Sequence, residues 1–194
     1  MKPNLTKVTY GLLATSLVAL VGCVVTSVYP YYTAKDVVSD PALIGTWAEA
    51  GETNAAEKNW QFAAGPDQAY QLTVRDTAET TGFTARLFSL QGRRYLDVLP
   101  AKREDDFIPP HYLLAVSRLD GAALEMSLLS YDWLTKLVTT NPAALRHVWV
   151  DRDAQQPDGG KLVLTADTAE LQRFILQYRD DTNAFAETLK LVRQ

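Results

Sequence analysis

From position 43 onward, the chain consists of short runs in which apolar and polar side chains alternate, separated by turn residues. Apolar residues such as Tyr70, Leu72 and Val74 recur at every second position, which is the spacing that puts one face of a β-strand into a core. Between two of these runs, Gly121 supplies the positive φ of a tight hairpin turn. Strands at this spacing, mostly joined by hairpins, predict an antiparallel barrel or sandwich. The expected strands cover residues 45–50, 59–63, 70–75, 83–90, 95–99, 112–119, 123–130, 147–151, 161–165 and 188–192.

Two segments follow the helical period instead. Residues 131–139 carry one apolar stripe and end shortly before Pro142, a residue that disfavours helix at the position preceding it. A second helix begins after Asp167, whose carboxylate can cap it, with Glu170 as the reciprocal partner in a capping box. Its apolar residues fall at i, i+3, i+4 and i+7, so we expect this amphipathic helix to pack on the sheet. They are Leu171, Phe174, Ile175 and Tyr178.

The start of the chain combines a cationic head with a long apolar run. Lys2 and Lys7 precede residues 8–28, which carry no charge, and this pattern is typical of a secretory signal. The tetrapeptide Leu20-Val21-Gly22-Cys23 resembles the lipobox of bacterial lipoproteins. By that resemblance, cleavage falls between Gly22 and Cys23, and Cys23 becomes the lipidated N-terminus.

We expect three parts of the chain, the first from the lipobox resemblance and the other two from the residue pattern. Residues 1–22 are the lipoprotein signal peptide, 23–42 the lipidated N-terminus and a tether, and 43–194 the β-barrel-like domain. We expect the tether to pack partly on the domain; the alternative is that its tyrosines, residues 29, 31 and 32, rest on lipid headgroups. The apolar run could also remain as an uncleaved membrane helix, because 21 residues span a bilayer of roughly 30 Å.

A short motif on the first expected strand adds a second resemblance. Gly45-Thr46-Trp47, together with a late helix and one closing strand, resembles the lipocalin and wider calycin group. This implies a mainly β fold, an antiparallel lipocalin-like barrel with a short helix and a C-terminal amphipathic helix packed on it. It also implies that Trp47 plugs one barrel end and that a basic side chain, Arg193 or Arg152, covers the indole ring.

The whole-chain pattern, which includes residues 85–90, 96–100 and 132–134, resembles in addition a group of uncharacterised bacterial lipoproteins. That resemblance implies no activity. Whether the apolar run is cleaved before Cys23 or remains as a membrane helix, we expect the domain to lie outside the cytoplasmic membrane. Val24, the residue after the cysteine, is not the Asp that retains lipoproteins at the inner membrane of enteric bacteria, so a Gram-negative host would place it at the outer membrane.

Charge and composition restrict the chemistry. The chain has 19 Lys and Arg against 23 Asp and Glu, a net charge of −4, which argues against holding nucleic acid by its phosphates. With two His and one Cys, the chain has too few ligands for a Cys/His zinc site. The sequence also contains no motif of a catalytic nucleophile and no phosphate-binding loop. We therefore expect that the protein is not an enzyme and that it binds no cofactor. His111 and His147 are interpreted as polar residues at strand ends, with a role as general base as the alternative.

The remaining candidates allow two interpretations each. Asp151, Asp153 and Asp158 could attract calcium, but the spacing departs from an EF-hand loop and favours a solvated hairpin, so no metal site is expected. Aromatic residues on the expected strands either fill the core or line an apolar cavity. The candidates for the barrel end and for ligand lining are Gly45, Trp47, Trp60, Tyr70 and Tyr112.

We therefore expect a membrane-anchored envelope lipoprotein that binds a small molecule or a lipid. A protein-interaction or assembly component of the cell envelope is the alternative. A hydrolase that uses His111 or His147 is the third and least favoured hypothesis.

Overall fold

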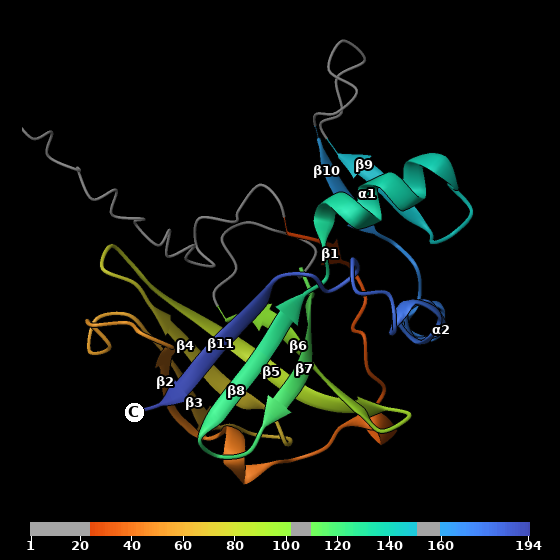
Figure 1. The fold of residues 1–194 in the computed structure, drawn as a ribbon. Helices are drawn as coiled ribbons and strands as arrows, with labels where there is room; N and C mark the ends of the chain where they lie inside the picture. Colours follow the sequence, from red (N-terminus) through yellow and green to blue (C-terminus); the bar gives the residue numbers. More distant parts are fainter. Residues whose placement is uncertain (1–23, 102–109, 151–159) are drawn as a thin grey trace, which may run out of the picture.

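The central element is a closed antiparallel β-barrel. The computed structural model describes residues 24–101, 110–150 and 160–194. Eight strands close in the order β11-β2-β3-β4-β5-β6-β7-β8 (Figure 1). This confirms the mainly β barrel that the alternating pattern predicts. The strands are β2 (Gly45–Glu49), β3 (Asn59–Ala64), β4 (Tyr70–Arg75), β5 (Thr80–Leu90), β6 (Arg93–Pro100), β7 (Tyr112–Leu119), β8 (Ala123–Leu128) and β11 (Thr188–Arg193).

The last strand closes the barrel. In β11, Leu191 lies opposite Leu124 of β8 on one side and opposite Glu49 of β2 on the other. Because β11 pairs on both sides, neither β2 nor β8 is left with a free row of backbone donors and acceptors. Closure therefore depends on a strand that follows β8 by about sixty residues of chain.

Two of the expected strands do not join the barrel. β9 (His147–Val150) and β10 (Lys161–Leu164) form a separate three-stranded sheet with β1 (Thr26–Ser27), in the order β1-β10-β9. In this sheet β1 runs parallel to β10, and β9 runs antiparallel to it. Figure 1 shows this small sheet at the upper right, beyond one end of the barrel.

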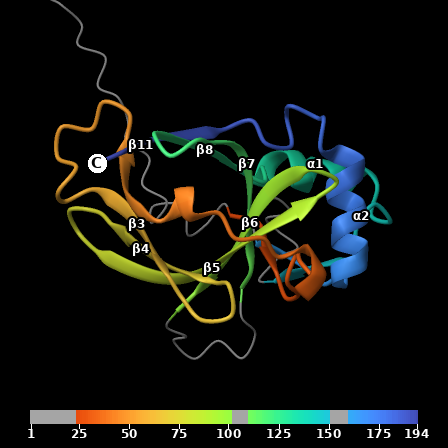
Figure 2. The same ribbon diagram turned by 90° about the horizontal axis from the view of Figure 1, so that it is seen from below.

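The two helices pack on the flank of the barrel. The helix α1 (Tyr131–Thr140) begins after Ser130, and α2 (Thr168–Tyr178) begins after Asp167, whose carboxylate accepts from the Glu170 amide at 2.9 Å. Figure 2 shows both helices to one side of the strands. They share a core with outward-facing side chains of β5, β6 and β7 and with the inner face of the small sheet. The barrel side of this core consists of Phe88, Leu90, Tyr95 and Leu113.

The capping box at α2 forms only in part. Asp167 caps the helix as the sequence predicts, but the Glu170 carboxylate accepts hydrogen bonds from the backbone and side chain of Arg146. Arg146 also pairs with Asp167 at 2.8 Å. One arginine from the loop before β9 thus engages both acidic residues of the first turn.

The segment that we expected to form a tether lies against the domain along its length. β1 belongs to the small sheet, and the 3-10 turn η2 (Ala34–Asp36) follows it. Val37 then forms a backbone bridge with Phe88, and a second 3-10 turn, η3 (Pro41–Leu43), leads into the barrel. Tyr31 is 1% exposed and Tyr32 contacts Phe88, so of the three tyrosines only Tyr29 is exposed. Tyr31 and Tyr32 therefore belong to the packed domain and not to a surface on lipid headgroups.

Candidate functional site

The inward faces of the barrel strands form an apolar wall. Alternate residues of each strand belong to one buried cluster, because successive side chains of a strand point to opposite faces. Representative members from six strands are Phe62, Leu72, Leu87, Leu96, Leu114 and Met126. The barrel interior therefore offers hydrophobic side chains on all sides.

One end of the barrel is sealed by Trp47 and Arg193. The Trp47 side chain is fully buried, and its Nε1–H donates to the Leu43 carbonyl at 2.9 Å. The Arg193 guanidinium carbon lies 4.5 Å from the centre of the indole ring, a cation–π contact. The same guanidinium donates to the carbonyl oxygens of Ala42, Ile44 and Gly121. The predicted cover of the indole ring is confirmed, with Arg193 in that role.

Gly45 makes room for this contact. Its φ is +142°, which L side chains rarely adopt, and a Cβ atom there would overlap the guanidinium of Arg193. Both the backbone angle and the close approach therefore require glycine. Gly45 thus forms part of the seal between Trp47 and Arg193.

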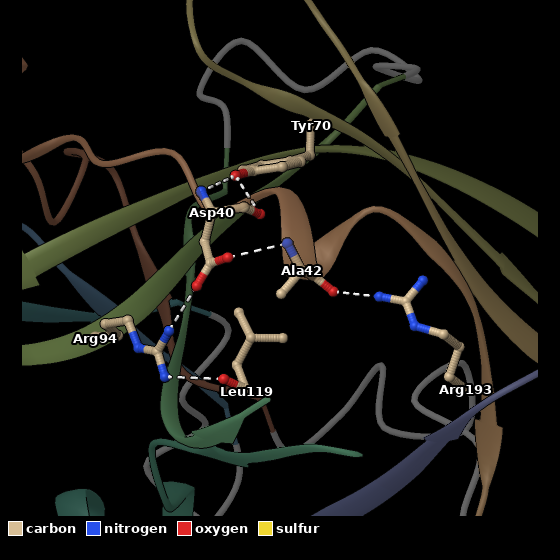
Figure 3. A network of polar contacts seen from close by, with 6 residues as sticks. All are labelled: Asp40, Ala42, Tyr70, Arg94, Leu119 and Arg193. Carbon is tan, nitrogen blue, oxygen red and sulfur yellow. Dashed lines mark hydrogen bonds and ion pairs between the residues drawn. The ribbon is translucent and has the colours of Figure 1, made fainter. Parts of the chain in front are cut away.

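A polar network holds the turn η3 across the same end (Figure 3). The Asp40 carboxylate accepts from Arg94 Nη1 at 2.8 Å and from the Ala42 amide at 2.9 Å. The Tyr70 hydroxyl accepts from the Asp40 amide at 2.8 Å and donates to its carbonyl at 3.2 Å. Arg94 also donates to the Leu119 carbonyl. Tyr70 is therefore committed to closing the barrel.

The opposite end is bordered by partly exposed apolar side chains. It is formed by the starts of β5, β7 and β11 and by the end of β8. The partly buried residues there that pack on the barrel core are Phe83, Tyr112, Leu128 and Leu189. Trp60 is 7% exposed and lies opposite Trp47 in the register of β2 and β3. The candidate residues thus divide: Gly45, Trp47 and Tyr70 at the sealed end, Trp60 beside Trp47, and Tyr112 at the other end.

Outside the barrel wall, a buried polar pair joins β6 to the N-terminal segment. Asp97 is 3% exposed, and its Oδ1 lies 2.7 Å from His111 Nδ1. Its Oδ2 accepts from the Tyr31 amide at 2.9 Å, and the His111 backbone pairs with Ser27 in both directions. Burial, and then the nearby Asp97 charge, raise the pKa of the Tyr31 hydroxyl well above its usual range.

The two histidines therefore differ. His111, expected as a polar strand-end residue, is buried and bonded to Asp97, 14 positions away in sequence. His147 has its Nδ1 2.8 Å from the carbonyl of Leu145, two positions before it in the chain, and packs edge-on to Trp149. No sequence signal could have found the Asp97–His111 pair, because Asp97 occupies an outward position of a regular strand. The same holds for Asp40 and Arg94, which are 54 positions apart.

Other predicted features lie outside the described residues. These are Gly22 and Cys23, the Asp151, Asp153 and Asp158 group, and Arg152. In the part of the chain that the structure describes, no group of three or more His, Cys, Asp or Glu could hold a metal ion. Among those same residues, no helix is both long and apolar enough to cross a bilayer.

Comparison with family models, with curated proteins and with solved structures finds no match to this chain. The eight-stranded closed barrel is itself consistent with a calycin-like fold.

Proposed function

We propose that this chain is a lipid-anchored protein of the bacterial cell envelope whose barrel binds a small apolar molecule or a lipid. One observation carries the binding proposal. The apolar barrel is sealed at one end by Trp47 and Arg193, while partly exposed apolar side chains border the other. We propose that this second end is the accessible one. An apolar interior that can be reached there suits a hydrophobic ligand, because binding removes apolar surface from water on both partners.

The anchor proposal comes from the sequence around Cys23. A charged head, an apolar run and a small residue before a single cysteine are what lipidation and cleavage require. In a Gram-negative host, Val24 in place of Asp favours the periplasmic side of the outer membrane. We further propose that the protein acts by binding and not by catalysis, which fits the lack of any nucleophile motif in the sequence.

Replacing Cys23 by serine tests the anchor. We expect the wild-type protein to incorporate labelled palmitate and to sediment with membranes, and Cys23→Ser to lose the label. Several acyl chains give firm attachment, since each buried CH₂ contributes about 0.8 kcal/mol. Cys23 is the only cysteine, so no other thiol can carry the label. An unlabelled wild-type protein that keeps residues 1–22 would favour the uncleaved membrane helix instead.

Two neighbouring positions on β11 test the barrel. Leu189 packs on the barrel core near the accessible end, whereas Lys190 is exposed on the outer face of the same strand. We expect Leu189→Trp to weaken binding of a fluorescent fatty acid by about tenfold or more, because the indole ring occupies the space that the probe needs. Lys190→Trp adds the same ring outside the barrel and should bind like the wild type. Equal binding by both variants would place the probe outside the barrel.

A further inference from the structure

The small three-stranded sheet has one buried and one exposed face. On the inner face, the alternate residues Val25, Ser27, Leu162 and Leu164 are at most 2% exposed. On the outer face, Val148 and Val150 of β9 are 46% and 42% exposed. Alternation along the strands places five further partly or fully exposed residues there. We call this set the valine face: Val24, Thr26, Val28, Val148, Val150, Lys161 and Val163.

The valine face is unusual for this molecule. The described residues include five exposed large hydrophobic side chains, and three of them, Tyr29, Val148 and Val150, lie on this sheet or directly after its first strand. Lys161 is the single charged residue among the seven members of the face. Clustered exposed apolar residues mark a surface that meets another apolar surface.

The chain enters this face directly from the proposed anchor. Val24 is already fixed in the fold, because it forms an antiparallel backbone bridge with Ser130. Cys23 precedes it by one peptide unit, which spans about 3.8 Å between Cα atoms. Acyl chains on Cys23 would therefore hold the start of the sheet within about 10 Å of the lipid headgroups. With β1 packed into the sheet, no slack remains to lift the domain away from the bilayer.

We infer that the valine face lies on the bilayer that holds the Cys23 acyl chains. This inference depends on the proposed lipidation. The valine side chains would enter the boundary between headgroups and acyl chains, as apolar faces of peripheral proteins do, while the Lys161 ammonium reaches lipid phosphates. Contact at this depth leaves the backbone groups along β9 within reach of water and headgroups, as their hydrogen bonding requires.

The same arrangement determines how the barrel is oriented relative to the bilayer. Ser27 of β1 pairs with His111, the neighbour of Tyr112, and Ser130 follows Leu128 by two residues. The anchored segment therefore runs beside the accessible end of the barrel, and the end sealed by Trp47 and Arg193 is the more distant one. A hydrophobic ligand taken from the membrane would therefore be close to the barrel interior.

Two single-cysteine probes test the inference. In the acylated full-length protein the Cys23 thiol is blocked, so a cysteine at Val148 or Val192 is the only site for an environment-sensitive dye. Val192 is the matched control, because it is an exposed valine near the end of β11, at the sealed end of the barrel. Figure 1 shows that end of β11, next to the marked C-terminus, away from the small sheet. Both proteins are placed in vesicles of phosphatidylethanolamine and phosphatidylglycerol, with or without a lipid that carries a quencher near the headgroup.

We expect the dye on Val148→Cys to be quenched about threefold or more, and the dye on Val192→Cys to be unaffected. If the protein floats with the vesicles but the two dyes are quenched equally or not at all, the valine face does not lie on lipid, while the anchor proposal stands. If the dye at position 148 is shielded from water without quenching, and the unlabelled Val148→Cys protein forms a disulfide-linked dimer, the face is a dimer interface and the inference is wrong. Protein that does not float contradicts the anchor proposal and the inference together.

Discussion

Replacing Trp47 by alanine is expected to lower the free energy of unfolding by about 3–5 kcal/mol. The indole ring is fully buried at the sealed end, so its removal leaves a large void that the surrounding strands cannot fill. The Leu43 carbonyl loses its indole donor, and the Arg193 guanidinium loses the ring beneath it. These losses coincide because one side chain joins the turn η3, the first barrel strand and the last.

Urea unfolding of Trp47→Ala, followed by far-ultraviolet circular dichroism, measures this effect. The matched control is Trp47→Phe, which keeps an aromatic ring under Arg193 but removes the Nε1–H donor to Leu43. We expect the phenylalanine variant to lose less than half as much stability. A loss below about 1 kcal/mol in Trp47→Ala would mean that the sealed end contributes little to folding.

The second large effect is expected at Asp97. Replacement by alanine should cost about 3 kcal/mol, because it leaves the buried Tyr31 amide and the His111 imidazole without their shared acceptor. Asp97→Asn keeps an oxygen that can accept from Tyr31 and should be milder. Since Tyr31 lies in the N-terminal segment, the damage should concentrate where that segment meets the barrel.

Amide hydrogen exchange distinguishes this local effect from general destabilisation. We expect the Tyr31 amide to exchange much faster in Asp97→Ala, while the Trp47 amide in the barrel changes less. A double-mutant cycle with His111→Ala measures the coupling between the two side chains, which should be at least about 1 kcal/mol for a buried hydrogen-bonded pair. Unchanged protection at Tyr31 would show that Asp97 does not hold the N-terminal segment.

The barrel strands could be predicted because each one has a buried and an exposed face. In β4, Tyr70, Leu72 and Val74 point inward while their neighbours point outward, and this period of two is visible in the sequence. The start of α2 could be predicted equally well, because the Asp167 carboxylate caps it by accepting from the Glu170 amide, three residues later. Such signals are local: the interacting groups lie within a few residues of one another.

The site was predictable only where a family resemblance supplied long-range information. Trp47 was expected to meet Arg193 or Arg152, and it meets Arg193, although 146 positions separate the two residues. No resemblance predicted that Asp40 pairs with Arg94 or that Asp97 pairs with His111. An isolated charged residue on a strand has the same local pattern whether it faces water or a buried partner.

For the small sheet, too, the sequence predicted the strands but not their tertiary contacts. β9 and β10 alternate like the barrel strands, so the sequence determined that they are strands but not which sheet they enter. Their separation from the barrel depends on β1 as a third strand and on the helices that cover the inner face. Similarly, the tyrosine and proline residues of segment 24–42 looked like a tether. In the fold, Val25 and Tyr31 of this segment, and Leu43 directly after it, are buried in cores with residues that come much later in the chain.

The sequence by itself therefore determined the barrel strands, the two helices and the mainly β class, because each depends on side chains near one another in the chain. Only the tertiary structure decided which strands close the barrel, which end Trp47 and Arg193 seal, and that Val24 already pairs with Ser130. Those features depend on contacts between distant segments, and such contacts form only where packing makes the whole arrangement favourable.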